Sequence, residues 1–160
     1  MATNANTIYV TSASNHTIVM HIPEMLISKT WTKRGQRYPF DREQLVQAYY
    51  HASVEYLFKQ GMLTTDDKDF LKEVGLMDEE EHTEIVTLTD ALMMRIIKHM
   101  PVSELKKTLG TLSRTQLTEV GEYAVEHYQD LNMDRIDILT KATGKNILKA
   151  IDNYKKAQEE

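Results

Sequence analysis

Cysteine is absent from the 160 residues of this chain. Its absence excludes disulfide bonds, thiol nucleophiles and thiolate metal sites, and it agrees with a reducing compartment. Long apolar runs are absent as well: no segment approaches the ~20 apolar residues that a membrane-spanning helix needs. The start of the sequence lacks the charged and apolar regions of a signal peptide. We therefore expect a cytoplasmic protein without membrane contacts.

The chain also lacks a complete phosphate-binding loop. Gly144-Lys145 resembles the end of one, but that motif requires a glycine five positions before Gly144 and Ser or Thr after Lys145. These two positions hold Leu139 and Asn146. The simpler prediction is that Gly144 ends a helix.

Two other spacings suggest chemistry but are incomplete. Glu79 and His82 lie three residues apart, as metal ligands do in di-iron helical bundles, yet the second Glu-x-x-His pair of such a site is missing. His51 and Glu55 could form an acid–base pair on a helix, although pairs at this spacing are usually weak surface interactions. We therefore predict no enzymatic activity, no metal, no cofactor and no small-molecule substrate.

The composition that remains is typical of a folded protein, with 41% apolar and 27% charged residues. The net charge of −5 is unevenly distributed, because residues 1–62 carry +2 and residues 63–160 carry −7. The acidic total argues against non-specific binding of duplex nucleic acid through the whole surface. A local basic patch could still bind phosphate.

The first 40 residues favour β-strands. Residues 7–14 and 17–22 alternate in polarity and are rich in Thr, Ile and Val, so they predict a hairpin that turns between them. We expect a third strand over Met25–Trp31, followed by a basic loop at residues 33–37.

From Asp41 onward the pattern is helical. Asp41 and Gln44 predict a capping box at the start of a helix that reaches about Gln60 and buries Tyr56 on its apolar face. A run of acidic residues in the first turn predicts that the longest helix covers residues 79–99. Shorter helices are expected at Thr64–Val74, Ser103–Leu109, Arg114–Tyr128, Met133–Ala142 and Asn146–Ala157.

Together these elements predict an α+β fold, in which an N-terminal β-hairpin or small antiparallel sheet packs on a predominantly helical body. By pattern the chain divides into residues 1–77 and residues 78–160. The two parts form either separate regions with a hinge in the acidic residues 76–84 or one continuous domain.

Basic and aromatic residues alternate after the third expected strand, which suggests a contact surface. Trp31, Lys33, Arg34 and Arg37 could contact a protein partner, or could pair with phosphates while rings stack on bases. Alternatively the loop at 33–37 is a solvated turn and the aromatic rings anchor the hairpin on the helices. The rings concerned are those of Trp31, Tyr38 and Phe40.

Aromatic residues also crowd more than one face of the helix expected from Asp41. A ring that does not fit inside, such as that of Tyr50, would suit self-association. The alternative for these rings is ordinary core packing.

Four segments of the N-terminal half can be compared with known protein families: Ile22–Trp31, Lys33–Gly35, Val54–Leu63 and Leu71–Leu76. Together they resemble small, mostly uncharacterised proteins of tailed bacteriophages. The resemblance covers residues 18–77 and identifies no catalytic residue. It implies a virion or assembly component, or a small factor acting on host machinery, located in the host cytoplasm or in the virion.

The leading hypothesis is a non-enzymatic protein-interaction module. It would contact a protein partner or a second copy of itself through Trp31, Lys33, Arg34, Arg37 and Tyr50. The alternative hypothesis is a nucleic-acid-binding accessory factor that uses the same basic loop.

Overall fold

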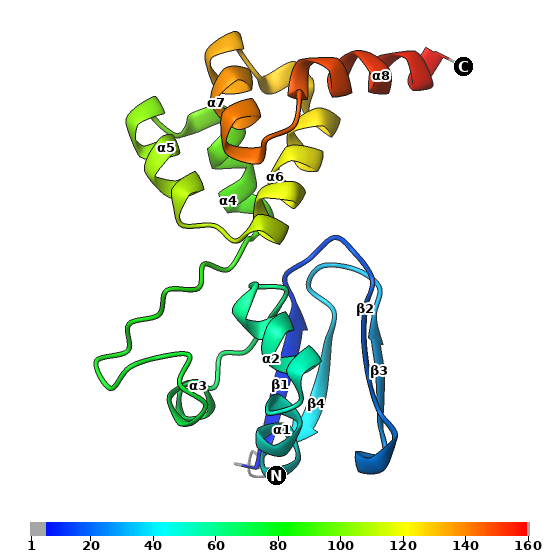
Figure 1. The fold of residues 1–160 in the computed structure, drawn as a ribbon, viewed down its shortest axis with the longest axis vertical. Helices are drawn as coiled ribbons and strands as arrows, with labels where there is room; N and C mark the ends of the chain where they lie inside the picture. The colour runs from blue at the N-terminus through cyan, green and yellow to red at the C-terminus, as the bar shows by residue number, and fades with distance from the viewer. Residues whose placement is uncertain (1–5, 160) are drawn as a thin grey trace. The chain divides into compact units, whose positions relative to one another are not determined.

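The computed structural model describes residues 6–159, apart from the side chain of Ala52. Its contacts divide the chain into two compact units, Met1–Thr87 (unit 1) and Leu88–Glu160 (unit 2). Unit 1 holds small antiparallel sheets and unit 2 is helical, which confirms the α+β class (Figure 1). The acidic residues 78–84 therefore belong to unit 1.

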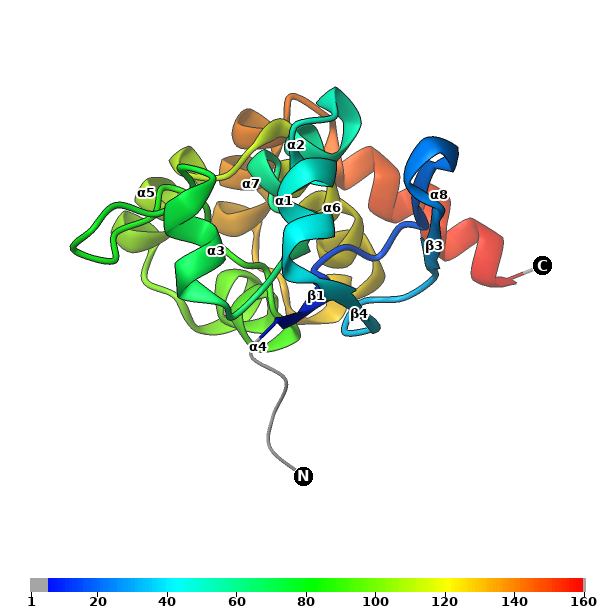
Figure 2. The same cartoon turned by 90° about the horizontal axis from the view of Figure 1, so that it is seen from below.

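Unit 1 is built on two small antiparallel sheets. One has the strand order β4-β1-β5, and the other is the β2–β3 hairpin, which is closed by a short 3-10 turn, η1. In Figures 1 and 2 the hairpin lies on the opposite side of unit 1 from α3. The bounds are β1 Thr7–Ser12, β2 Ile18–Ile22, η1 Pro23–Met25, β3 Ile27–Trp31, β4 Arg37–Asp41 and β5 Leu63–Thr64.

The expected hairpin between residues 7–14 and 17–22 is wrong, because β1 pairs with β4 and β5 while β2 pairs with β3. Hydrogen bonds at the end of β1 explain the change of direction. The Ser12 hydroxyl donates to the Ser14 carbonyl oxygen at 3.1 Å, which turns the chain locally. The Ser12 N–H donates at 2.9 Å to the carbonyl oxygen of Gln36, far along the sequence.

The expected third strand is confirmed by β3, whereas β4 is a strand that the sequence pattern did not suggest. Pro39 stands in the middle of β4, opposite Tyr9 of β1. A proline cannot donate to a ladder, so it is tolerated because β4 is an edge strand.

The first expected helix is interrupted. Two helices, α1 (Arg42–Tyr49) and α2 (Ala52–Lys59), replace the single helix expected from 42 to 60. The backbone of His51 is extended (ψ 131°) and starts the second helix in a new direction. The prediction that Tyr56 is buried is therefore wrong: this side chain is 53% exposed.

Of the two hydrogen bonds of the predicted capping box, only the one to the Asp41 carboxylate is present. Its carboxylate accepts a hydrogen bond from the Gln44 N–H at 3.3 Å. The Gln44 side-chain amide does not return to Asp41 and donates instead to the carbonyl oxygen of Met25 at 3.0 Å. The residue thus ties α1 to the turn of the β2–β3 hairpin.

Helix α3 (Lys68–Glu73) begins later than the sequence pattern indicated, because Asp67 caps it. One carboxylate oxygen of Asp67 accepts from the Phe70 N–H at 2.9 Å, and the other lies 2.6 Å from an Arg42 guanidinium nitrogen. Burial raises the pKa of Asp67, but these hydrogen bonds lower it by more, so its pKa lies below the ordinary value.

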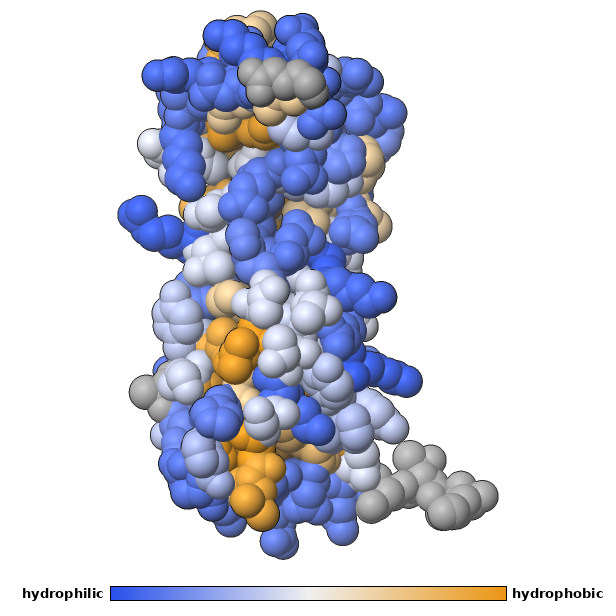
Figure 3. Space-filling model, turned by 90° about the vertical axis from the view of Figure 1, so that its right-hand side faces the viewer, coloured by the Kyte–Doolittle hydropathy of each residue, from blue (hydrophilic) through white to orange (hydrophobic). Residues whose placement is uncertain are grey.

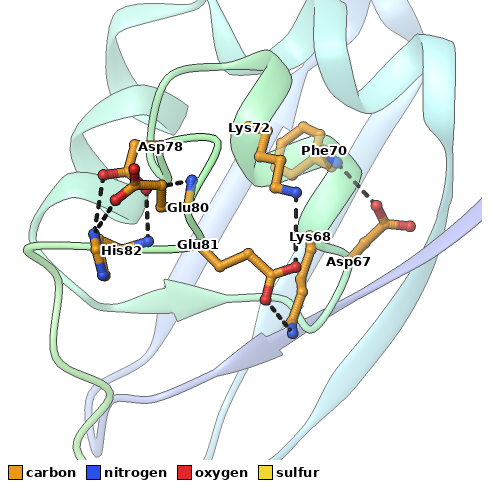
Figure 4. Close-up of polar contacts among 8 residues, drawn as sticks. All are labelled: Asp67, Lys68, Phe70, Lys72, Asp78, Glu80, Glu81 and His82. Carbon is orange, nitrogen blue, oxygen red and sulfur yellow. Dashed lines mark hydrogen bonds and ion pairs between the residues drawn. The ribbon is translucent and has the colours of Figure 1, made fainter.

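The longest expected helix, residues 79–99, is wrong in its first half. Asp78 accepts hydrogen bonds from the N–H groups of Glu80 (3.0 Å) and His82 (2.8 Å), as Figure 4 shows. Such side-chain bonds to nearby backbone compete with helical hydrogen bonds. Helix begins only at α4 (Asp90–Met94) and continues as a π-helical turn, η2.

Unit 2 contains α4 and η2 followed by four α-helices, and the four short helices expected there are confirmed with small shifts of their ends. The observed bounds are η2 Arg95–His99, α5 Val102–Gly110, α6 Arg114–Glu126, α7 Met133–Thr143 and α8 Ile147–Glu159, with a 3-10 turn η3 Tyr128–Asp130 between α6 and α7. The expected end at Gly144 is also confirmed, since it closes α7 with a φ of 72°.

A buried arginine organises unit 2. Arg135 on α7 is almost fully buried, and its guanidinium donates to the carbonyl oxygens of Ile96 (2.7 Å) and Met100. Both carbonyls lie at the end of η2, where a helix leaves acceptors without internal partners. Arg135 therefore completes the end of that helical segment from another helix.

Among residues 6–159, the structure contains no helix with the length and apolar character needed to cross a lipid bilayer.

Candidate functional site

Trp31, the centre of the expected contact surface, lies in the core of unit 1. Its ring is fully buried, stacks on Phe40 at 6.2 Å between centroids and meets the edge of Tyr38 at 5.3 Å. The indole N–H donates to the carbonyl oxygen of Val10 at 3.1 Å. Trp31 is therefore not accessible to a partner in this structure, and its ring packs against β1 and β4. That the aromatic rings anchor the hairpin on the helices stays a prediction.

The loop after Trp31 is held in one shape by its own polar groups. Gly35 has a φ of 90°, which suits glycine, and its N–H donates to the Ser12 carbonyl oxygen at 2.8 Å. The Gln36 side-chain oxygen accepts from the Thr32 N–H at 2.7 Å. Lys33 is exposed on this loop.

Arg34 is engaged inside unit 1. Its guanidinium donates to the Ala13 carbonyl oxygen at 2.6 Å and to the Asn15 side-chain oxygen at 3.1 Å. These bonds join the loop after β3 to the loop after β1. Arg34, which was expected to bind a partner, thus stabilises the contact between these two loops.

Arg37 lies on the outer face of the β4-β1-β5 sheet and is exposed. Its guanidinium carbon lies 4.5 Å above the centroid of the Tyr9 ring, a cation–π contact. Tyr9 is 47% exposed and pairs across the ladder with Pro39. The sequence pattern missed this pair because it joins strands whose pairing was not predicted.

Tyr50 stands at the corner between α1 and α2, apart in sequence from the basic loop. It is 64% exposed and rests edge-on against Tyr49, with ring centroids 5.5 Å apart. Tyr49 itself is buried beside Phe58 and Phe70, and burial raises the pKa of its hydroxyl. The buried ring therefore supports an exposed one, as the self-association hypothesis requires of Tyr50.

The most exposed apolar side chain of the described residues was not among those expected. Leu26 follows η1 at the turn of the β2–β3 hairpin and is 94% exposed. Its backbone is left-handed (φ 56°), and its N–H donates to the Pro23 carbonyl oxygen at 3.0 Å. A turn that places a leucine where glycine or asparagine is favoured is unusual. In the sequence, this strained position could have been suspected only from the lack of glycine or asparagine in the turn Pro23–Leu26.

Figure 3 looks at unit 1 from the side of this hairpin, and apolar atoms reach the surface there among polar ones. Val19 on β2 contributes to the exposed apolar surface with 57% of its side chain accessible. The hairpin therefore presents apolar groups on its strand as well as at its turn.

The acidic segment that contains the suspected metal ligands is bound to α3. Glu81 has a left-handed backbone (φ 67°), and its carboxylate lies 2.9 Å from the Lys68 ammonium and 3.6 Å from that of Lys72 (Figure 4). The hydrogen bond from Lys68 lowers the pKa of Glu81. Glu79 and His82 do not share a helix, and no group of three His, Asp or Glu side chains within residues 6–159 could hold a metal ion.

Unit 2 contains two surface grooves between helices. One of about 430 Å³ lies between α6 and α8, and the other, of about 470 Å³, lies among α5, α6 and α7. The lining of the first includes the apolar or aromatic residues Val125, Ile147 and Tyr154 together with the charged Glu122 and Lys145.

The five expected contact residues thus separate into different groups. Lys33 and Arg34 lie in the β3–β4 connection, Arg37 is the first residue of β4, Trp31 lies in the core, and Tyr50 belongs to the α1–α2 corner. The chain matches no family model, no curated protein and no solved structure.

Proposed function

We propose that the protein is a non-enzymatic protein-interaction module whose contacts are made by unit 1. The observation that carries this proposal is Leu26. A left-handed leucine costs roughly 1–2 kcal/mol, and its exposure gives the fold nothing in return. A partner that buries the side chain would explain both features, since strained backbone and exposed apolar groups concentrate at functional surfaces.

The other exposed side chains of unit 1 support the same function. They include tyrosines and an arginine, the residue types that dominate binding energy at protein interfaces. The set consists of Tyr9, Val19, Leu26, Arg37, Tyr50 and Tyr56. Each sits on a strand, a helix or a hydrogen-bonded turn, so little ordering is required when a partner binds.

The resemblance of residues 18–77 to phage proteins favours a role in a virion or in its assembly, or on host machinery. These settings require defined contacts with other proteins rather than catalysis. We therefore propose a phage structural or assembly component as the specific form of the interaction module.

The experiment for this proposal replaces Leu26 by asparagine. Asparagine tolerates the left-handed backbone, so Leu26→Asn removes only the apolar contact. Leu148→Asn, on an exposed face of α8 in unit 2, is the matched control. We expect Leu26→Asn to weaken self-association, measured by light scattering at low and high salt, or capture of a phage or host partner by the tagged protein. Equal binding by both variants would contradict the proposal.

A second function, binding of single-stranded nucleic acid, is favoured by the contact between Arg37 and Tyr9. A cation above an exposed ring is a small version of the stacking platforms that bind single strands, and the loop that precedes Arg37 carries a further exposed cation, Lys33. The double variant Lys33→Ala/Arg37→Ala should then weaken oligonucleotide binding and flatten its salt dependence. Lys59→Ala on α2 is the control, and an unchanged salt slope would reject this function.

A further inference from the structure

Strand β2 forms one edge of its sheet. Among the described residues it pairs only with β3, with Val19 opposite Thr30. The Thr30 carbonyl oxygen accepts at 2.8 Å from the hydroxyl of Tyr38, which belongs to β4 in the other sheet, so we infer that this oxygen points away from β2. Val19 and Thr30 therefore form a non-hydrogen-bonded pair of the antiparallel ladder. In such a pair the backbone N–H and C=O groups of both residues point away from the partner strand. The N–H and C=O of Val19 therefore point away from β3, and those of Thr17 and His21 follow by the period of two.

The outward-pointing backbone groups of β2 make no hydrogen bonds to other described parts of unit 1. Within residues 6–159, Val19 and His21 make no hydrogen bond outside the β2–β3 ladder. Thr17, Val19 and His21 are all exposed, whereas Ile18 and Met20 between them are buried. The strand therefore offers a free backbone edge together with an apolar side chain at its centre.

The other strand edges of unit 1 carry features that discourage pairing. β4 contains Pro39, which has no N–H, and the charged Arg37. β5 has only two residues. β3 is covered by the Tyr38 hydroxyl and carries Lys29, whose ammonium lies 5.3 Å from the Tyr38 ring. Strand β2, Ile-Val-Met-His-Ile, has neither proline nor a Lys, Arg, Asp or Glu side chain.

We propose that a second copy of this chain pairs with β2, antiparallel, about a two-fold axis through Val19. The inference rests on the proposed function, since it assigns a partner to the same interacting unit. Val19 would lie opposite the Val19 of the second copy, and Thr17 opposite its His21. The two hairpins would form one four-stranded sheet, and Pro23 would remain outside the ladder.

The sequence of β2 fits its own copy better than it fits a charged partner. In this register no Lys, Arg, Asp or Glu side chain of β2 meets another one. Ile18 and Met20 would bring the apolar rows of both copies into line on the inner face. Pairing would also satisfy the outward N–H and C=O groups of both strands at once.

The absence of cysteine makes a direct test possible. Residues facing each other in a hydrogen-bonded antiparallel pair have Cα atoms about 5.5 Å apart, within the range of a disulfide. We expect Val19→Cys to form a covalent dimer under mild oxidation, reversed by dithiothreitol. Thr30→Cys is the control, because it shares the exposed face but would lie about three strand spacings, or ~14 Å, from its copy. Cross-linking of Val19→Cys no faster than that of Thr30→Cys would overturn the pairing.

A second pair of variants tests the unmodified edge in solution. Val19→Lys brings two like charges together at the axis and should weaken dimerisation by at least about tenfold. Thr30→Lys adds the same charge on the neighbouring strand and should leave the dimer intact, as measured by sedimentation and light scattering. A wild-type protein that stays monomeric at the highest measurable concentration, or a dimer that Val19→Lys does not weaken, overturns the inference.

Leu26→Asn separates this inference from the proposed function. If Val19→Lys leaves the oligomeric state unchanged while Leu26→Asn abolishes partner binding, the edge pairing fails and the interaction module stands. If Val19→Lys dissociates the dimer while Leu26→Asn has no effect on any binding, the pairing is supported and Leu26 is not its contact.

Discussion

Units 1 and 2 differ in where they place their unusual residues. Among the described residues, the polar side chains that unit 1 buries are only those of small hydroxyl residues, whereas unit 2 buries Gln116, Glu119 and Arg135. All the strongly exposed tyrosines of the described residues lie in unit 1. Unit 2 therefore uses buried polar side chains to pack its own helices, whereas unit 1 presents its tyrosines on the surface.

Charge gives the same contrast. Unit 1 has eight Lys or Arg against thirteen Asp or Glu, and nine of these acids lie in residues 66–84. Unit 2 has eleven of each sign, so its net charge is zero. Unit 1 therefore has a net charge of −5, with a basic loop and an acidic segment in one compact body, and we expect long-range charge effects on binding to come mainly from it.

The largest expected effect comes from removing the buried charge of unit 2. Arg135→Met leaves the carbonyls of Ile96 and Met100 without their donor, and each such loss costs about 1–3 kcal/mol. We expect unit 2 to be destabilised by about 3 kcal/mol, observed as helical circular dichroism lost at lower urea. The emission of Trp31, the only tryptophan, reports on unit 1 and should keep its midpoint.

The exposed Arg114→Met, on α6 of the same unit, is the control for Arg135→Met and should change little. If the midpoint of the Trp31 emission shifts together with that of the helical circular dichroism in Arg135→Met, the two units unfold together. That result would contradict the proposed difference between them.

The matching experiment in unit 1 is Trp31→Phe. It removes the hydrogen bond to Val10 and leaves a cavity in the core, so we expect a loss of about 2 kcal/mol. Urea unfolding followed by circular dichroism measures the loss. Tyr50→Phe, at an exposed ring, should leave the midpoint unchanged. An unchanged midpoint in Trp31→Phe would mean that the ring does not anchor the two sheets.

A smaller, pH-dependent effect is expected at Asp67. Its pKa is lowered in the folded protein, so the carboxylate stabilises the fold above its ordinary pKa, and this stabilisation is lost as the pH falls through the folded pKa. Asp67→Asn keeps a cap for α3 but loses the ion pair with Arg42, and it should cost less than about 1 kcal/mol at neutral pH because both partners are partly exposed.

Asp67→Ala loses the cap as well and should cost about 1 kcal/mol more than Asp67→Asn. Urea midpoints between pH 2.5 and pH 7 measure both variants. In strong acid the difference between wild type and Asp67→Asn should disappear. A difference that persists there would show that the charge of Asp67 is not its cause.

The smallest effect has the opposite sign. Leu26→Asn relieves the left-handed leucine and should raise the stability of unit 1 by about 0.5–1 kcal/mol. Leu148→Asn lies in helix α8, where asparagine has the poorer helix propensity, and should lower that of unit 2 slightly. Thermal unfolding of the two variants compares them. A loss of stability in Leu26→Asn would mean that the leucine supports the hairpin itself.

Features that depend on neighbouring residues could be predicted from the local pattern. Asp41 begins a helix as expected, and Ser113 begins another in the same way, because a capping side chain bonds to amides only two or three residues away. Gly61 and Gly144 end helices with positive φ for an equally local reason, the absence of a Cβ atom. Alternating apolar residues also placed the correct faces of β1 and β2 in the core.

Which distant segments of the chain pair with each other could not be predicted from the local pattern. The pairing of β1 with β4 depends on contacts across some 30 residues, so no local pattern could separate it from a hairpin with β2. The break at His51 turns Phe58 inward and Tyr56 outward, although a continuous helix satisfies the same local spacing. For the same reason the burial of Trp31 and the exposure of Leu26 were out of reach of the sequence pattern: both depend on what packs around a side chain, and those neighbours are supplied by the whole fold.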